Sequence, residues 1–438
     1  MKVAVIGTGY VGLVSGACFA DFGHTVTCVD KDATKIDRLH QGIMPIYEPG
    51  LDTLVASNVD EDRLFFTTEA KDAIAEADAV FIAVGTPSRR GDGHADLSFV
   101  YAVAEEIADL MGGFTVVVTK STVPVGTGDE VEEIICKKRP DGDFAVVSNP
   151  EFLREGAAIK DFKIPDRVVV GTDDERAKEL MRELYRPLFL NETPILFTNR
   201  RTSELIKYAA NAFLAVKITF INEMADLCEK VGANVQEVSR GIGLDGRIGS
   251  KFLNAGPGYG GSCFPKDTLA LTKTANDYDS PVRIVDTVVE VNAARKKAMA
   301  DKIIQAMAGD VSGKTIGVLG LAFKQNTDDM RDAPSLDILP ILTAAGAKVK
   351  AFDPEAMDEA KHLLEDIEYA GNAYDAAEQA DALVIITEWD QFRALDLKRV
   401  KDAMAGNVLV DLRNIYTPAD AGKYGFAYTS IGRATELA

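Results

Sequence analysis

A single glycine-rich turn, GTGYVG at residues 7–12, constrains the fold of this chain more than any other segment. A short apolar run, Val3-Ala4-Val5-Ile6, leads into it, and small and apolar residues at helical spacing follow from Leu13 to Phe22. A strand, a tight glycine turn and a helix in this order are typical of dinucleotide-binding domains, because the N–H groups at the start of the helix can bind a pyrophosphate. We therefore expect Gly7, Gly9, Tyr10, Val11 and Gly12 to contact a dinucleotide.

Asp30 strengthens this interpretation. It ends the next β-branched run, His24 to Val29, at about the ~20-residue offset where a carboxylate accepts hydrogen bonds from the ribose hydroxyls. A carboxylate at this position also repels a 2′-phosphate. The sequence therefore favours NAD over NADP, although Lys31 and Lys35 lie nearby.

The rest of the chain repeats the strand–helix rhythm on both sides of a helical middle. Buried-strand runs occur at 79–84, 115–119 and 145–148, and again at 315–319, 348–352, 383–387 and 408–412. Helical patterns span 202–231 and 281–307. Apolar runs with this rhythm indicate parallel sheets covered on both faces. We predict an α/β protein with two Rossmann-like, doubly wound domains, 1–200 and 309–438, joined by a helical domain, 201–308, with one long central helix.

Composition excludes several function classes. The 438 residues include 48 Lys and Arg against 68 Asp and Glu, a formal charge of −20, which disfavours nucleic acid and anionic membranes as partners. No segment reaches the ~20 apolar residues of a membrane span. The five cysteines form no CxxC pair, so we expect no disulfide framework, no metal site and a cytoplasmic location.

Cys263 is the cysteine whose surroundings indicate chemistry. The four histidines lie outside the motif-rich segments, which argues against a histidine base or zinc. Cys263 lies in GYGGSCFPKD, residues 258–267, where Lys266 would favour the thiolate. A thiolate beside NAD suits aldehyde oxidation, because the thiohemiacetal loses hydride and the thioester is then hydrolysed to a carboxylate. The other cysteines lie in apolar patterns and are interpreted as structural: Cys18, Cys28, Cys136 and Cys228.

Several longer motifs resemble the UDP-glucose/GDP-mannose dehydrogenase family. They are KSTVPVG at 120–126, NPEFLREG at 149–156, ELIKYAANAFL at 204–214, GGSCFPKD at 260–267 and FKQNTDDMR at 323–331. The resemblance extends from Gly7 to Arg413, and the sequences of these motifs most resemble those of bacterial members that act on UDP-glucose. It implies two successive oxidations of the C6 alcohol to UDP-glucuronate, with two NAD and one water, for polysaccharide biosynthesis.

The same resemblance implies roles for individual residues. Cys263 is the expected nucleophile, and Lys207 and Asn211, four apart on one helix face, stabilise the alkoxide or oxyanion. Asp267 and Thr122 hold the water that accepts the first proton, Glu151 assists thioester hydrolysis, and Glu155 lies on the nicotinamide side.

The remaining expected contacts also follow from the resemblance. Those to NAD, beyond the glycine turn and Asp30, come from Lys35, Thr86, Thr122, Glu155, Lys266 and Arg331. Those to the nucleotide sugar come from Glu151, Phe152, Leu153, Arg154, Glu155, Lys207, Asn211, Arg247, Phe252, Leu253, Asn254, Ala255, Gly256, Tyr259, Gly260, Lys324 and Arg413. Arg247 is expected to reach across from a partner subunit, in a homodimer formed through the long helix.

Two alternatives remain open at this point. The same chemistry could act on GDP-mannose or a UDP-N-acetylhexosamine, because no residue visibly recognises uracil. A non-catalytic sensor of NAD or nucleotide sugar would keep the fold but lose part of the catalytic set. All six candidate catalytic residues are present: Cys263, Lys207, Asn211, Thr122, Glu151 and Asp267.

Overall fold

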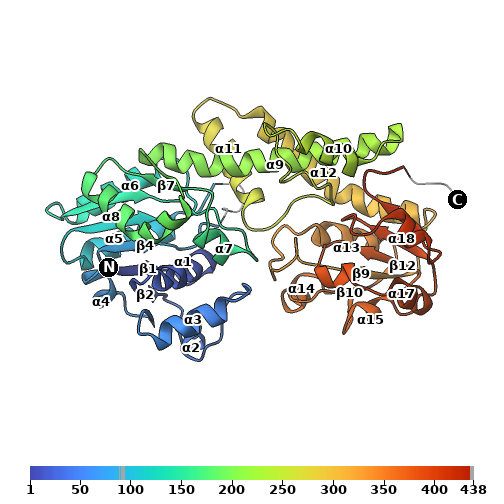
Figure 1. Ribbon diagram of the computed structural model, residues 1–438, viewed down its shortest axis with the longest axis horizontal. Coiled ribbons are helices and arrows are strands. Elements are labelled where there is room, and N and C mark those ends of the chain that lie inside the picture. The colour runs from blue at the N-terminus through green and yellow to red at the C-terminus, as the bar shows by residue number, and fades with distance from the viewer. Residues whose placement is uncertain (88, 90–93, 435–438) are drawn as a thin grey trace. The chain divides into compact units, whose positions relative to one another are not determined.

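The chain folds into two compact units. The computed structural model describes residues 1–87, 89 and 94–434. Unit 1 contains Met1–Ala210 and Lys273–Ser280, and unit 2 contains Asn211–Thr272 and the residues from Pro281 onward. The boundary falls within α9 (Arg200–Val231), which is one uninterrupted helix (Figure 1).

Unit 1 is built on an eight-stranded sheet with the order β3-β2-β1-β4-β5-β6-β7-β8. Its neighbouring strands are parallel except for β6 and β7. The strands are β1 (Lys2–Ile6), β2 (Thr25–Val29), β3 (Leu64–Thr67), β4 (Ala79–Ile82), β5 (Thr115–Thr119), β6 (Phe144–Ser148), β7 (Val168–Gly171) and β8 (Ile195–Thr198). The helices are α1 (Tyr10–Asp21), α2 (Ala33–His40), α3 (Leu51–Asp60), α4 (Ala70–Ala75), α5 (Ser98–Leu110), α6 (Thr127–Lys138), α7 (Ala158–Lys163), α8 (Glu175–Leu184) and the 3₁₀ helix η1 (Arg186–Asn191).

Side chains that alternate between the two faces of the strands explain why both faces of the unit 1 sheet are covered. In β1, Val3 and Val5 belong to one buried cluster, whereas Ala4 and Ile6 belong to another. Successive side chains of a strand point to opposite faces, so both faces of this sheet are covered by apolar side chains and helices.

Unit 2 repeats this architecture on a six-stranded parallel sheet with the order β11-β10-β9-β12-β13-β14. Its strands are β9 (Thr315–Leu319), β10 (Lys348–Phe352), β11 (Glu368–Tyr369), β12 (Ala382–Ile385), β13 (Val408–Asp411) and β14 (Ala427–Ser430). Its helices include α13 (Pro334–Ala344), α14 (Met357–Leu363), α15 (Ala373–Ala377), α16 (Asp390–Arg393), α17 (Leu397–Ala403) and α18 (Pro418–Gly422). The order 3-2-1-4-5-6 is that of a doubly wound dinucleotide-binding sheet.

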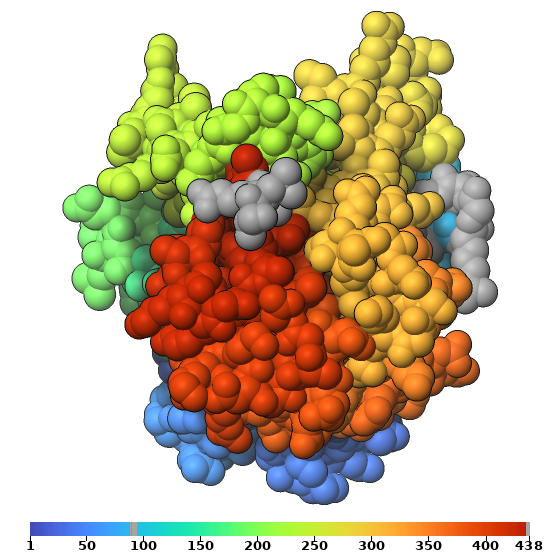
Figure 2. Space-filling model, turned by 90° about the vertical axis from the view of Figure 1, so that its right-hand side faces the viewer, coloured from blue at the N-terminus to red at the C-terminus, as the bar shows by residue number. Residues whose placement is uncertain are grey.

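Three further helices complete the middle of the chain: α10 (Val235–Gly243), α11 (Phe264–Asp277) and α12 (Arg283–Ala306). α11 begins immediately after Cys263, a helix start that the sequence analysis did not anticipate. Figure 2 shows the red C-terminal residues reaching the yellow-green segment that contains α10. There the Val235 N–H donates to the Gly432 carbonyl at 2.8 Å, so the end of the chain is joined to the middle of unit 2.

The predicted fold class is confirmed. Two α/β parallel-sheet domains and a long central helix are present, and most predicted strands agree with the observed ones to within two residues. One expectation about the core was wrong, because Cys136 is exposed. The buried side of α6 is formed by Thr127, Val131 and Ile135, and Cys136 lies outside that stripe.

Phe19 tests the core of unit 1. It is fully buried, with its ring centroid 5.0 Å from those of Phe81 and Phe162 and 5.5 Å from that of Tyr185. Phe19→Ala should lower the free energy of unfolding by about 3–5 kcal/mol, because it removes buried area and leaves a cavity. Urea denaturation measures this loss, and Phe99→Ala on exposed surface is the control. Equal effects of the two substitutions would contradict the described core.

Candidate functional site

The glycine turn follows β1 in unit 1, and its three glycines meet different surroundings. Gly7 has φ +106°, and a Cβ there would lie 2.6 Å from the Ala83 carbonyl oxygen. A Cβ on Gly12 would lie 1.9 Å from the Gly7 carbonyl oxygen. A Cβ on Gly9 would meet nothing within 4 Å. Gly7 and Gly12 therefore permit close packing of the backbone, whereas Gly9 leaves open space at the start of α1, where a pyrophosphate could approach.

Asp30 lies beside this turn. Its Oδ2 accepts from the Thr8 N–H at 2.8 Å and the Thr8 hydroxyl at 2.7 Å, and its Oδ1 accepts from the Asp32 N–H at 3.0 Å. Burial opposes ionisation, but these hydrogen bonds and Lys35, at 3.9 Å, hold the pKa of Asp30 below its usual value. The carboxylate is thus ionised and 14% exposed, available to the hydroxyls of a ribose. The sequence analysis missed Thr8, because the glycine pattern does not specify the residue type at that position.

The corresponding carboxylate of unit 2 has a different environment. Asp353 follows β10, and its Oδ2 accepts from the N–H groups of Leu321 and Ala322 at 2.7 and 3.1 Å and from Trp389 Nε1 at 3.2 Å. Its side chain is fully buried. Asp353 is therefore occupied by its own protein, and of these two aspartates only Asp30 is accessible to a ligand.

A second carboxylate, Glu48, connects the glycine turn to the segment that contains Glu155. The Tyr10 hydroxyl donates to Glu48, and the carboxylate also accepts from the N–H groups of Gly156 at 2.7 Å and Ala158 at 2.8 Å. Burial and the nearby Glu48 raise the pKa of Tyr10, which therefore remains a neutral donor. Sequence reasoning missed Glu48, since its contacts lie between 38 and 110 residues away along the chain.

Thr86 and Thr122 meet where β4 and β5 end. The Thr86 hydroxyl donates to the Thr122 carbonyl at 3.0 Å. Parallel strands present their carboxyl ends at one sheet edge, so the two predicted residues are brought together with the glycine turn in unit 1.

Lys207 and Glu151 form a buried ion pair in unit 1. Lys207 Nζ lies 3.0 Å from Glu151 Oε1, and their side chains are only 3% and 5% exposed. Glu151 also accepts from the Leu153 N–H, and the Phe152 ring lies 5.3 Å from Lys207 Nζ. Arg154 is instead held by Asp161 through Nε at 2.8 Å and Nη2 at 2.6 Å. The structure thus brings Lys207, Glu151 and Phe152 together, while Arg154 points to a structural partner.

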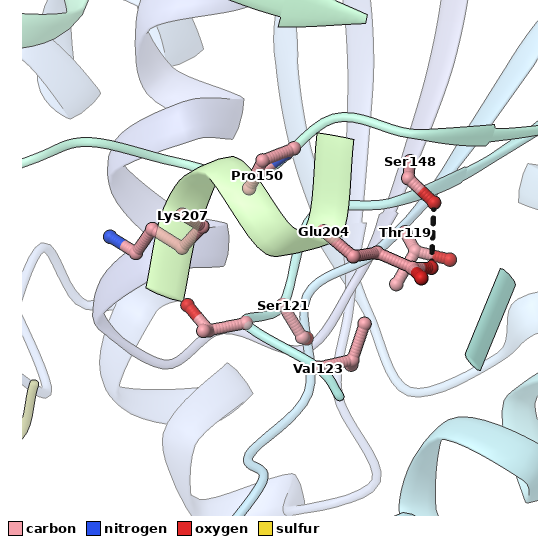
Figure 3. A pocket seen from close by; sticks show the side chains of 8 residues that line it. Thr119, Ser121, Val123, Ser148, Pro150, Glu204 and Lys207 are labelled. Atoms are coloured by element: carbon pink, nitrogen blue, oxygen red, sulfur yellow. Dashed lines mark hydrogen bonds between the residues drawn. The ribbon is translucent and has the colours of Figure 1, made fainter. Parts of the chain in front are cut away.

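Glu204, one helical turn before Lys207, anchors this part of α9. It accepts from the N–H groups of Gly126 and Gly128 at 2.7 and 2.8 Å, at the start of α6, and from the Ser148 hydroxyl at 2.9 Å (Figure 3). Burial raises the pKa of Glu204 although these donors oppose it. Beside it lies a cavity of about 10 Å³, lined by Thr119, Ser121, Thr122, Val123, Ser148, Pro150, Glu204 and Lys207.

The Cys263 segment belongs to unit 2 and is fastened to residues 329–332. The Gly261 N–H donates to the Arg331 carbonyl at 2.7 Å, and the Ser262 N–H donates to Asp329 Oδ2 at 3.2 Å. A Cβ on Gly260 would lie 2.3 Å from the Asp332 carbonyl oxygen. The glycines therefore permit close contact that fixes the backbone before Cys263. Its Sγ lies 3.4 Å from the Ser262 hydroxyl.

Asp267 connects two other predicted residues of unit 2. Asn211 Nδ2 donates to its Oδ2 at 2.6 Å, and Lys266 Nζ lies 2.7 Å from its Oδ1. The Asp267 side chain is 1% exposed. Lys266, predicted to act on Cys263, thus has an ion-pair partner in Asp267.

The segment 252–260 is held by residues of α9 and α12. Asn222 Oδ1 accepts from the Gly256 N–H at 2.9 Å, Arg295 Nε donates to the Gly256 carbonyl at 2.7 Å, and Asn292 Oδ1 accepts from the Tyr259 N–H at 2.9 Å. These three supporting residues were missed, since each lies in a helical pattern more than 30 residues from its partner. Phe252 has φ +63°, and Leu253 and Ala255 are buried while Asn254 is exposed.

Arg413 and Lys324 approach the same part of unit 2. Arg413 donates to the Ile386 carbonyl at 2.7 Å and the Phe323 carbonyl at 2.8 Å, and its Nη1 would lie 3.3 Å from a Cβ on Gly256. Lys324 Nζ lies 5.1 Å from the Phe323 ring centroid.

Two other predicted arginines lie beside nearby carboxylates. Arg331 pairs with Asp329 at 2.8 Å. Arg247 is 90% exposed and pairs with Asp245 at 2.6 Å. The structure therefore does not join Arg247 to the other candidates.

Two features are absent from the described residues. No group of three or more His, Cys, Asp or Glu side chains there could hold a metal ion. None of the helices in residues 1–87, 89 and 94–434 is long and apolar enough to cross a membrane.

Family models match most of the chain. Residues 1–189 match the NAD binding domain of the UDP-glucose/GDP-mannose dehydrogenase family, residues 201–294 its central domain, and residues 317–418 its UDP binding domain.

Individual relatives match over nearly the full length. A UDP-glucose 6-dehydrogenase of Rhizobium meliloti (strain 1021) is 67% identical, covering 99% of this chain and 100% of the relative. UDP-glucose 6-dehydrogenase TuaD of Bacillus subtilis (strain 168) is 49% identical, covering 99% and 93%. The solved structure of a UDP-glucose dehydrogenase from Pyrobaculum islandicum is 38% identical, with a TM-score of 0.91 and coverage of 99% and 98%. The chain belongs to the UDP-glucose/GDP-mannose dehydrogenase family.

Proposed function

We propose that this protein is an NAD-dependent UDP-glucose 6-dehydrogenase, which oxidises the C6 alcohol of UDP-glucose to the carboxylate of UDP-glucuronate. The observation that carries the proposal is the rigid placement of Cys263 at the start of α11, in the unit that also contains the Asn211–Asp267 pair. The name of the 67% identical relative supports UDP-glucose over GDP-mannose or a UDP-N-acetylhexosamine as the substrate. The complete catalytic set argues against a non-catalytic sensor.

Unit 1 fits NAD. Gly9 leaves room for the pyrophosphate, the Asp30 carboxylate faces the turn, and Tyr10 and Val11 begin α1. Lys35 lies beside Asp30, and the Thr86 hydroxyl donates to the Thr122 carbonyl. By the family resemblance we also assign Thr86, Thr122, Glu155, Lys266 and Arg331 to NAD. When bound, NAD supplies the hydride acceptor for each of the two oxidations.

In the first oxidation the protein must take a proton from the C6 hydroxyl. We assign this to a water held by Asp267 and Thr122. Asp267 is buried and already accepts from Asn211 and Lys266, so its carboxylate is oriented by two donors. Lys207 and Asn211 donate to the oxygen as negative charge develops, and each such donor contributes about 3–4 kcal/mol in comparable oxyanion sites.

In the second oxidation the Cys263 thiolate adds to the aldehyde carbon and forms a thiohemiacetal. Loss of hydride and of the hydroxyl proton converts this adduct to a thioester, and water then attacks the thioester carbonyl and releases the carboxylic acid and the thiol. Glu151 assists the attacking water. The 3.0 Å pair of Glu151 with Lys207 supports this assignment, because Lys207 is the proposed oxyanion donor.

We assign the nucleotide sugar to the residues that the family motifs indicate. Arg413 lies beside Gly256, and Lys324 follows Phe323, whose carbonyl accepts from Arg413. The residues of the 252–260 segment assigned to the sugar offer mostly backbone groups: Phe252, Leu253, Asn254, Ala255, Gly256, Tyr259 and Gly260. The family resemblance also assigns Glu151, Phe152, Leu153, Glu155, Lys207 and Asn211 to the sugar, and Arg247 to the site of a partner subunit. It assigns Arg154 to the sugar as well, but the Arg154 side chain and N–H are held by Asp161.

A homodimer is part of the proposal. Phe213, Phe220 and Leu227 are spaced by seven residues on α9 and are 64%, 47% and 51% exposed. Side chains seven residues apart lie on one stripe of a helix, and an apolar stripe of this kind favours burial against a second copy.

Three further points remain proposals. The division into 1–200, 201–308 and 309–438 follows the three family-model segments 1–189, 201–294 and 317–418. The five free cysteines suit the reducing cytoplasm. The product is proposed to supply polysaccharide biosynthesis.

The ratio of NADH formed to UDP-glucose consumed tests the reaction. Purified protein should form two NADH per UDP-glucose consumed, measured by absorbance at limiting substrate, and Cys263→Ser should lose net formation of UDP-glucuronate while binding NAD normally. Cys136→Ser, an exposed thiol outside the site, is the matched control. A ratio of one, or full activity of Cys263→Ser, would contradict the proposal.

Asp30 tests the cofactor assignment. Asp30→Asn should raise KM for NAD roughly tenfold or more, because a charge-assisted hydrogen bond contributes about 1.5–3 kcal/mol. Initial rates at saturating UDP-glucose measure this, and Asp52→Asn, an exposed residue of α3 with the same charge change, is the control. An unchanged KM for NAD in Asp30→Asn would refute the assignment.

Substitutions in the apolar stripe of α9 test the proposed dimer. Phe213→Glu combined with Phe220→Glu should convert a dimer into a monomer, measured by light scattering after gel filtration. Phe189→Glu, at an equally apolar residue of unit 1 that is 80% exposed, should leave the dimer intact. A monomeric wild type, or a double variant that stays dimeric, would exclude this interface.

A further inference from the structure

Lys120 is a buried cation that the reaction above does not use. It follows β5 directly, and the residue is only 5% exposed. Its ammonium donates to Asn149 Oδ1 at 3.2 Å and to the Tyr185 hydroxyl at 3.3 Å. No carboxylate of residues 1–87, 89 and 94–434 lies within 4.0 Å of it as an ion-pair partner. Buried lysines are normally paired with acids, because burying a charge costs free energy. A buried lysine without a carboxylate beside it therefore indicates a function.

The contacts of Lys120 join the two strand-end turns that carry candidate catalytic residues. Lys120 is two residues before Thr122, and its own N–H donates to the Ile82 carbonyl at 3.0 Å. Asn149 is two residues before Glu151, and its N–H donates to the Thr119 carbonyl at 3.0 Å. A rigid link from Lys120 to Asn149 therefore fixes the turn of Thr122 relative to the turn of Glu151.

Further contacts hold the Lys120 ammonium and its partner Asn149. The Tyr185 hydroxyl donates to Asn149 Oδ1 at 2.7 Å, and Asn149 Nδ2 donates to the Val169 carbonyl at 2.7 Å. The rings of Phe162 and Tyr185 lie 5.8 and 5.9 Å from the ammonium, within the range of cation–π attraction. These contacts hold the ammonium in one position without neutralising it.

We propose that Lys120 is a positioning residue of the catalytic site: its buried ammonium holds the turns of Thr122 and Glu151 in place and adds positive charge behind the Glu151–Lys207 pair. This inference rests on the proposed function for its catalytic meaning. Its structural basis is the buried network of Lys120, Asn149 and Tyr185.

The Lys120 amine loses its charge in a pH range where activity can be measured. Burial lowers the pKa of Lys120 to about 8, while the nearby Glu151 opposes that shift and Lys207 adds to it. The titratable and charged groups that face it are Glu151 after β6, Lys207 on α9 and Tyr185 after α8, whereas α7 presents Phe162. Catalysis that depends on the charged amine must fall as the pH rises through about 8.

Activity measured against pH tests the proposal. Tyr185→Phe removes one acceptor of the ammonium but keeps the ring, so the alkaline fall of kcat should move to lower pH by about one unit. Lys120→Arg keeps a charge that does not titrate in this range and should remove that fall. Tyr101→Phe, a tyrosine on α5 outside the network, should match the wild type. An alkaline limb that is unchanged in both Tyr185→Phe and Lys120→Arg would overturn the proposal.

A second measurement does not depend on turnover. Because the pKa of Lys120 is lower in the folded protein than in the unfolded chain, the unfolded state binds more protons above pH 8, and the free energy of unfolding gains a contribution that increases from about pH 8 to about pH 10. Lys120→Met should lack this increase relative to the wild type in urea denaturation at pH 7.5 and 9.5. Parallel pH dependence in the two proteins would overturn the buried, charged state of Lys120. If the wild type does not oxidise UDP-glucose, the proposed function fails while this result still decides the state of Lys120.

Discussion

The hydrogen bonds of the Glu204 carboxylate hold the candidate catalytic residues of unit 1 in place. It binds two N–H groups at the start of α6 and the Ser148 hydroxyl at the end of β6, and so fixes the first turns of a 32-residue helix. Lys207 lies one turn further along and reaches Glu151. A shift of α9 by a fraction of a turn would separate this buried pair and leave a charge uncompensated, which costs about 3–5 kcal/mol in comparable cases.

The two Rossmann-like sheets show how one topology supports two kinds of site. The first six strands of unit 1 and the six strands of unit 2 have the order 3-2-1-4-5-6, and both units place an aspartate after the second strand. In unit 1 that aspartate, Asp30, remains partly exposed beside an open glycine, whereas in unit 2 Asp353 is fully buried and bonded to its own backbone and to Trp389. The distinction between a cofactor domain and a second nucleotide domain thus lies in side-chain contacts rather than in the fold.

Local pattern was sufficient for the fold class and for proposing the glycine turn and Asp30 as a cofactor site. The glycine turn, Asp30 and the buried strands have short-range signals, because glycine spacing and apolar runs reflect local geometry. The supporting residues have no such signal. Glu48, Glu204, Asn292 and Arg295 bond to groups between 33 and 110 residues away. Their roles arise only when the strands are assembled, so a single sequence does not reveal them.

We propose that oxidation ends in a covalent thioester on Cys263, and mass spectrometry of that residue tests this step most directly. Glu151→Gln should slow thioester hydrolysis, so a brief reaction with UDP-glucose and NAD followed by acid quenching and proteolysis should yield the Cys263 peptide carrying a UDP-glucuronyl group. The Cys263→Ser form of the same variant should yield no such adduct. Formation of UDP-glucuronate with Cys263 unmodified at every time, or an adduct on a different side chain, would contradict the account.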